Sequence, residues 1–327
     1  MLKFARFAAA LCMAICFRNV RVGVGFLIAA LCLATAMFAS VQDGITFLHI
    51  SDTHISDYTG AHPKLREWRD RHGETVAHLT NFLATTVREQ RPSFVVASGD
   101  LIDAYCLDSA SGGKEVFGQI ELFRSIIAKS PVPFYPGLGN HDIECYRYKE
   151  GATAAVGDQS VKAVTRQAWK TEIGAFHDGT YYSFRQSVGR TGYLFLILDD
   201  GEGGSFDRQY RASQMDWVKR QAVSHPADYL IFMMHIPLGK GSFTDDLREA
   251  AAGTGRVALA LAGHNHIDGL DEIPFGDRPL RQVRTAALEG GANNWRAIRL
   301  CEDHIDITET GNPTHTLLTL RLPESTH

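Results

Sequence analysis

Carboxylate, imidazole and carboxamide side chains gather in five short segments, each directly after an apolar run. The segments are Ser51–His54, Gly99–Asp103, Gly139–Asp142, Met234–His235 and Gly263–His266. Seven of their side chains are common metal ligands: Asp52, His54, Asp100, Asn140, His235, His264 and His266. A set of oxygen and imidazole donors without a thiolate suits a hard or borderline divalent ion such as Mn, Fe or Zn. The sequence therefore predicts a metal site built from these segments.

The number of donors is large enough for two ions. Asp100 is the natural shared ligand, because one carboxylate can bridge two metals through its two oxygens. Two ions about 3.5–4 Å apart can polarise a phosphoryl group and convert a water between them to hydroxide. The chemistry that this pattern favours is hydrolysis of a phosphate ester.

Each segment also has an ordinary structural interpretation. An Asp-x-His pair such as Asp52 and His54 is common, and His235 could be a hydrogen-bonded core histidine. Gly139–Asp142 could be a turn followed by a helix cap, since Asn and Asp favour both positions. The five segments occur together, each after an apolar run, and this joint occurrence favours the metal site over these alternatives.

The apolar runs before the five segments have the length and β-branched content of buried strands. We expect these strands at 45–50, 94–97, 133–138, 229–233 and 257–261. Ligands of α/β sheets bind beyond the carboxyl ends of the strands, so the five segments could converge on one site. Further strands are expected at 193–198, 283–288, 297–300, 305–308 and 316–320, and helices at 73–90, 116–128 and 213–223. Strands that alternate with helices and end in a β-rich tail predict a layered α/β domain with two sheets.

The composition is that of an ordinary globular protein with a slightly acidic balance. The chain has 327 residues, 45% hydrophobic and 21% charged, and a formal net charge of −4. This balance argues against a nucleic-acid partner, which usually requires a basic surface. A protein that binds phosphate despite this charge needs local positive charge, and bound metal ions can supply it.

The first 40 residues are interpreted as a targeting segment that precedes a domain spanning 41–327. An uncharged apolar run at 22–39 follows Lys3, Arg6, Arg18 and Arg21, which is the pattern of a secretory signal peptide. Its length of about 18 residues also suits an uncleaved membrane anchor. We therefore expect an extracytoplasmic protein, periplasmic or secreted, with attachment through residues 22–39 as the second interpretation.

Three cysteines lie beyond the targeting segment: Cys106, Cys145 and Cys301. An odd number does not make a disulfide framework. A single Cys106–Cys145 bridge would suit an oxidising compartment. Two separate, reduced cysteines are the alternative.

The five segments, taken in order, resemble the calcineurin-like metallophosphoesterase family. The family pattern is D-x-H, G-D-x-x-D, G-N-H-[DE], a single H and G-H-x-H, and this chain matches it from Asp52 to His266. The resemblance implies a four-layer αββα sandwich with two mixed β-sheets, the metallo-dependent phosphatase fold. It implies a hydrolase acting on phosphate mono- or diesters, with two divalent metal ions and a bridging hydroxide as nucleophile.

The resemblance also implies a role for each residue. The first metal would be held by Asp52, His54, Asp100 and His266, and the second by Asp100, Asn140, His235 and His264. His141 would be the general acid, Asp103 would orient it, and Asp142 would support the ligands from outside the metal shell. Asp103 stands where purple acid phosphatases have Tyr, and Ala104 where protein Ser/Thr phosphatases have Arg, which separates the chain from both groups.

The expected substrate is a small-molecule phosphate ester. Tyr146, Arg147 and Tyr148 lie in a stretch, 145–161, that we expect to be a long loop, and such loops are often functional. The three side chains could stack on a base and contact a phosphate, or could pack the loop. The narrower interpretation is a cyclic-nucleotide phosphodiesterase, and the competing one is a non-catalytic scaffold with the same fold. A scaffold would be expected to have lost ligands or His141, and this chain keeps all of them.

Overall fold

The computed structural model describes residues 44–107, 114–200, 208–252 and 256–322. The chain divides into two units, 1–43 and 44–327. The predicted targeting segment falls in the first unit and lies outside the described residues, so it stays a prediction. No helix in the described part of the chain is long and apolar enough to cross a membrane.

The first sheet has six strands in the order β14-β13-β12-β1-β2-β3. Its parallel part consists of β1 (Ile45–Ile50), β2 (Phe94–Ser98) and β3 (Phe134–Gly137). Its antiparallel part is formed by β12 (Arg296–Leu300), β13 (His304–Glu309) and β14 (Asn312–Arg321). Each predicted strand of this sheet is present, and the bounds agree within one residue except for β14, which begins at Asn312 and not at 316.

The second sheet also has six strands, in the order β10-β11-β9-β8-β7-β6. β7 (Thr191–Ile197), β8 (Tyr229–Met233), β9 (Val257–Ala262) and β11 (Arg278–Arg284) run parallel. β6 (Tyr182–Val188) and β10 (Gly269–Phe275) pair antiparallel at the two edges. Both sheets are therefore mixed, as expected.

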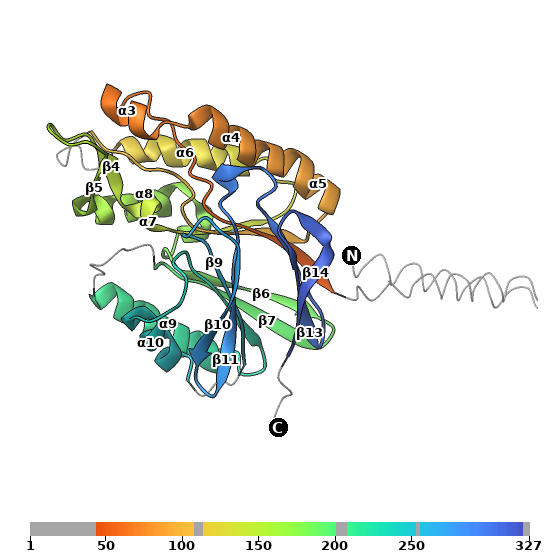
Figure 1. The fold of residues 1–327 in the computed structure, drawn as a ribbon. Helices are drawn as coiled ribbons and strands as arrows, with labels where there is room; N and C mark the ends of the chain where they lie inside the picture. The colour runs from red at the N-terminus through yellow and green to blue at the C-terminus, as the bar shows by residue number, and fades with distance from the viewer. Residues whose placement is uncertain (1–43, 108–113, 201–207, 253–255, 323–327) are drawn as a thin grey trace, which may run out of the picture. The chain divides into compact units, whose positions relative to one another are not determined.

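The two sheets pack face to face through an aromatic core. Phe47 of β1 stacks on Phe94 of β2 with ring centroids 5.0 Å apart, and Phe195 of β7 meets Phe47 edge to face at 5.4 Å. Such aromatic pairs contribute beyond their buried area. Helices cover the outer faces of both sheets (Figure 1). The predicted four-layer αββα fold is confirmed.

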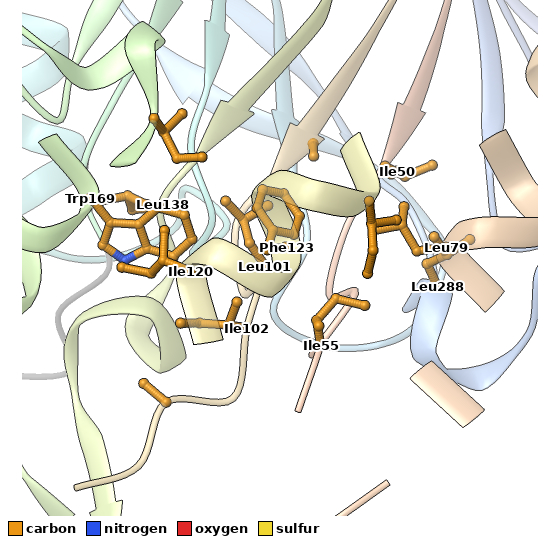
Figure 2. Packing of buried hydrophobic residues seen from close by; sticks show 14 of the residues in the cluster. Ile50, Ile55, Leu79, Leu101, Ile102, Ile120, Phe123, Leu138, Trp169 and Leu288 are labelled. Atoms are coloured by element: carbon orange, nitrogen blue, oxygen red, sulfur yellow. The ribbon is translucent and has the colours of Figure 1, made fainter. Parts of the chain in front are cut away.

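The helices that cover the first sheet come from the first half of the described chain. They are α3 (Pro63–Arg69), α4 (His72–Asn81), α5 (Val87–Gln90), α6 (Glu115–Ile127), α7 (Asn140–Ile143) and α8 (Lys162–Glu172). A π-helical turn, η1 (Phe82–Thr86), joins α4 to α5, so the helix expected at 73–90 is nearly continuous. Figure 2 shows Ile120, Phe123, Leu101 and Trp169 within the apolar cluster under these helices. The second sheet is covered by α9 (Arg208–Ser224) and α10 (Ser242–Ala250).

Two expectations about local structure are wrong. The stretch 145–161 is not a long loop: β4 (Cys145–Arg147) pairs with β5 (Val156–Asp158), and a 3-10 turn (Gln159–Val161) follows. Pairing with a segment distant in the sequence keeps this stretch extended. Cys106 N donates to Tyr146 O at 3.0 Å, and Tyr146 N donates to Ala104 O at 2.8 Å. The strand expected at 283–288 ends at Arg284, and a 3-10 turn, η4 (Leu288–Gly290), follows.

Cys106, Cys145 and Cys301 are buried thiols. Cys106 and Cys145 hydrogen-bond to each other, which lowers the pKa of Cys106 and raises that of Cys145. The two are therefore adjacent in this structure and not bridged.

Candidate metal centre

The five segments meet at one edge of the two sheets. Three of them follow β1, β2 and β3 of the first sheet, and two follow β8 and β9 of the second. All five strands are parallel to a neighbour within their own sheet. The carboxyl ends of parallel strands lie at the same edge, so residues far apart in the sequence come together there.

A first group of ligand atoms lies around Asp52. The donor atoms of Asp52, His54, Asp100 and His266 all lie within 4.8 Å of one another. His266 Nε2 is 3.2 Å from Asp52 Oδ1 and 3.3 Å from His54 Nε2. This is the set predicted for the first metal.

A second group lies around His235. The donor atoms of Asp100, His235 and His264 lie within 4.8 Å of one another. His264 Nδ1 is 3.1 Å from Asn140 Oδ1 and 3.2 Å from His235 Nε2. This group contains every residue predicted for the second metal.

Asp100 belongs to both groups. Its Oδ2 atom is 3.0 Å from His235 Nε2 and 3.7 Å from His54 Nε2. Its Oδ1 atom accepts a hydrogen bond from His141 N at 2.9 Å, which fixes the carboxylate. The geometry therefore places one carboxylate between the two sets of imidazoles.

The backbone at these positions is strained. Six described non-glycine residues have positive φ, and five of them are predicted ligands: Asp52 (53°), His54 (42°), Asp100 (49°), His264 (66°) and His266 (60°). The left-handed conformation costs a non-glycine residue about 1–2 kcal/mol. Such strain persists only where the surrounding structure imposes it, and it concentrates at functional sites.

The donor atoms fit a divalent cation. The Asp52 Oδ1 atom is buried and accepts no hydrogen bond, although two imidazole nitrogens face it. An orphaned carboxylate oxygen of this kind is costly unless a cation is bound. Burial lowers the pKa of His235, but the nearby Asp100 and Asp52 carboxylates outweigh it and raise that pKa to about 10. The site thus attracts positive charge, which bound metal ions would supply in place of protons.

His141 lies beside Asp100 with its ring held from both ends. Its Nδ1 is 2.8 Å from Asp103 Oδ1, and its Nε2 is 3.2 Å from the Tyr146 hydroxyl. Burial opposes ionisation of Asp103, but hydrogen bonds with His141 and Arg69 hold the pKa of its carboxyl well below the usual range. Arg69 donates from Nε to Asp103 Oδ2 at 2.8 Å and from Nη2 to Asp103 Oδ1 at 2.6 Å. Its guanidinium also lies 3.8 Å above the Tyr146 ring.

Two buried carboxylates hold the ligand loops through backbone amides. Asp142 accepts from Ile102 N at 2.9 Å and from Gly139 N at 2.7 Å, and so joins the second and third segments. Asp200 accepts from His235 N at 2.8 Å and from Ile236 N at 2.9 Å. Burial raises the pKa of Asp142 to about 8 and that of Asp200 to about 7.

The three predicted substrate-binding residues have different partners. Tyr146 contacts His141, as described above. Arg147 pairs with Asp158 across the β4–β5 hairpin, with Nε and Oδ2 3.4 Å apart. Tyr148 stacks on His62 with ring centroids 3.7 Å apart. The structure therefore brings one of the three, Tyr146, to the predicted acid.

Three further residues at the site were not predicted from the sequence: Arg69, Asp200 and Glu289. Arg69 ends α3, a helix that was not among those expected from the sequence. Asp200 comes after β7 and the two residues Leu198 and Asp199, and its position after an apolar run is a signal that could have identified it. Glu289 contacts His266 from η4, with Oε1 3.1 Å from His266 Nδ1.

Comparison with known proteins agrees with this geometry. A family model described as calcineurin-like phosphoesterase matches residues 45–268. A search of curated proteins finds no match.

Two solved structures share the fold. A dimetal phosphatase from Danio rerio is 14% identical with a TM-score of 0.57, covering 85% of this chain and 99% of that one. GAP50, the anchor in the inner membrane complex of Plasmodium, is 12% identical with a TM-score of 0.53, covering 87% of this chain and 91% of that one. At these identities the likeness concerns the fold alone.

Proposed function

Because this chain belongs to the calcineurin-like phosphoesterase family, we propose that it hydrolyses phosphate esters with two divalent metal ions. The observation that carries the proposal is the pair of ligand groups that share Asp100. The first ion would be held by Asp52, His54, Asp100 and His266, and the second by Asp100, Asn140, His235 and His264. When bound, a pair of Mn, Fe or Zn ions would polarise the phosphoryl group and supply a hydroxide nucleophile.

The protein itself supplies the proton for the leaving group. His141 Nδ1 is held by Asp103, so Nε2 is the ring nitrogen that can donate a proton. That nitrogen lies 3.9 Å from Asp100 Oδ2, at the edge of the ligand groups. His141 would therefore protonate the leaving oxygen as a general acid, and Asp103 would keep its ring in place.

The substrate proposed is a small-molecule mono- or diester, with a cyclic nucleotide as the narrower alternative. The competing function is a non-catalytic scaffold, since GAP50 shares the fold and is an anchor. Retention of every predicted ligand and of His141 favours the enzyme.

A metal and activity assay tests the proposal. Protein stripped with a chelator and reloaded with Mn²⁺ should bind two ions per chain and hydrolyse at least one of p-nitrophenyl phosphate, bis-p-nitrophenyl phosphate and cyclic nucleotides. Asp100→Asn removes a charge from between the two cations, so its metal content should fall below two and its activity by about tenfold or more. Asp245→Asn, an exposed carboxylate on α10, is the control. Two bound metals without turnover of any ester would favour the scaffold, and full activity of Asp100→Asn would exclude the shared-ligand assignment.

We also propose that residues 1–40 carry the domain out of the cytoplasm. The support is the basic and then apolar pattern of the segment. A fusion of residues 1–40 to alkaline phosphatase, which is active outside the cytoplasm, should give active enzyme in a bacterial host. An inactive fusion would contradict export.

A further inference from the structure

Glu289 lies on the side of His266 that faces away from the ligand group. The two ring nitrogens of His266 have different partners: Nε2 is 3.2 Å from Asp52 Oδ1, whereas Nδ1 is 3.1 Å from Glu289 Oε1. The imidazole therefore bridges a carboxylate of the predicted metal site and a carboxylate outside it.

Glu289 is held firmly from several directions. Its Oε2 atom pairs with Arg71, the N-cap residue of α4. Its backbone N–H donates to Asp52 O at 3.0 Å, and its carbonyl oxygen lies 2.8 Å from His78 Nδ1. The side chain is only 9% exposed. A carboxylate held in this way can determine the orientation of the ring that it contacts.

His266 depends on such a contact more than His54 and His235 do, because the His266 side chain is not fixed by packing. Its side chain is 42% exposed, compared with 6% for His54 and 0% for His235. His235 has the same arrangement with a neutral partner, since its Nδ1 lies 2.9 Å from Ser98 O while its Nε2 faces Asp100. The rings of His266 and His235 are thus oriented in the same way. In each, Nδ1 contacts an oxygen outside the ligand groups, and Nε2 faces a carboxylate within them.

We propose that Glu289 is a positioning residue that keeps the proton of His266 on Nδ1 and leaves Nε2 free to bind the first metal. This proposal rests on the two-metal site proposed above. A carboxylate acceptor at the second ring nitrogen fixes the tautomer and raises the basicity of the ligand, and its removal typically costs about 10–100-fold in metal affinity. Arg71 completes the arrangement by holding the other oxygen of Glu289.

The test measures metal binding and not turnover. Metal-free full-length protein is titrated with Mn²⁺ by calorimetry as wild type, Glu289→Ala, Glu289→Gln and Glu302→Ala. In Glu289→Ala, one of the two binding events should weaken by about 10–100-fold while the other stays unchanged. Glu289→Gln keeps an acceptor for the Nδ1 proton, so it should recover most of the lost affinity. Glu302 is an exposed carboxylate on the β12–β13 turn, and its removal should change neither event.

A purely structural role makes different predictions. If Glu289 served only to attach its loop to α4, Arg71→Ala would weaken binding as much as Glu289→Ala, and both binding events would suffer. Thermal unfolding of the metal-free variants shows whether they are folded. Unchanged affinities in Glu289→Ala, equal losses in both events, or no recovery in Glu289→Gln would each overturn the proposal. A wild type that binds two ions but hydrolyses no ester would refute the proposed function and leave this proposal standing, whereas a wild type that binds no metal would refute both.

Discussion

His141 touches the shared ligand without being one of the seven predicted metal ligands. It contacts Asp100 through its backbone amide and through Nε2, and Asp103 through Nδ1. A proton donor matters most when the leaving oxygen is strongly basic. In His141→Ala, hydrolysis of alkyl phosphate esters should therefore fall by about 10²–10⁴-fold. Hydrolysis of p-nitrophenyl esters, whose leaving group needs little protonation, should fall much less. Steady-state kinetics on matched esters measures this, and equal losses on both would argue against a general acid.

Arg69 should act on the Asp103–His141 pair, both members of which it contacts, and not on the metals. It donates two hydrogen bonds to that carboxylate and stacks on Tyr146. In Arg69→Ala, the rate of hydrolysis of alkyl esters should fall to roughly a tenth of the wild-type rate. As in His141→Ala, the rate on p-nitrophenyl esters should fall less, and the metal content should not change. Arg69→Lys should not restore the rate, because an ammonium cannot replace the two-pronged guanidinium. Arg66→Ala, on the exposed face of the same helix, is the control. Loss of metal from Arg69→Ala would contradict this role.

Some residues of the site can be predicted from the sequence, and others cannot. The seven ligands could be predicted because each follows an apolar run, and position after a strand is a local signal. Arg69 and Glu289 could not, because each reaches the site from another element through long-range packing. Tyr146 was identified for its chemistry, and the structure gives it a neighbour, His141, that no spacing indicated.

At the scale of elements, the turn after β3 has no room for a side chain at Gly139. A Cβ on Gly139 would lie 2.2 Å from Asp100 Oδ1 and 2.4 Å from Asp100 N. Gly139→Ala must therefore displace the shared carboxylate, and overpacking of this kind typically costs about 1–3 kcal/mol. We expect a lower melting temperature and fewer than two bound metals per chain, measured by thermal unfolding and metal analysis.

Gly118→Ala provides the matched comparison. Gly118 lies within α6, and a Cβ there would meet nothing within 4 Å. Alanine in a helix interior is favoured over glycine by roughly 0.5–1 kcal/mol, so this variant should melt slightly higher than wild type. Wild-type stability and metal content in Gly139→Ala would show that the turn can adjust, contrary to this argument.

Strands were predictable where they are buried on both faces and less so at the sheet edges. β1, β2 and β8 read as apolar runs, and their bounds agree with the expectation. The edge strands β6 and β10 contain few buried residues and include the charged residues Arg185, Asp271 and Glu272, and neither strand was predicted. The β4–β5 hairpin was missed because its partner, the segment around Tyr105, is distant in the sequence.

At the scale of the whole domain, the two sheets must keep a fixed position relative to each other for the metal ligands to meet, because the ligand segments come from both sheets. Motif order along the chain could predict the layers, but not which strands would lie side by side across the two sheets. One buried contact joins them near the site. His49 Nε2 lies 2.8 Å from Ser98 Oγ at the end of β2, and His49 Nδ1 lies 2.8 Å from Thr285 Oγ1, directly after β11 of the second sheet.

This histidine should make the stability of the domain sensitive to mild acid. Burial, with a smaller contribution from Arg296, lowers the pKa of His49 from 6.5 to about 3. Between these values the unfolded chain binds a proton that the folded chain does not. The free energy of unfolding should therefore fall as the pH is lowered from about 6.5, by up to about 1.4 kcal/mol per pH unit from this one group. Above pH 6.5 the histidine is neutral in both states and contributes no pH dependence.

Urea unfolding of the metal-free protein at pH values from 7 to 4.5 measures this contribution as a difference between variants. His49→Gln cannot take up a proton in the unfolded state, so its stability should decline less steeply over this range than that of the wild type. Carboxylates that titrate in the same range act in both proteins and cancel in the comparison. His177→Gln replaces an exposed histidine and should keep the wild-type slope. If His49→Gln and wild type lost stability in parallel, the buried histidine would not be the acid-sensitive link between the sheets.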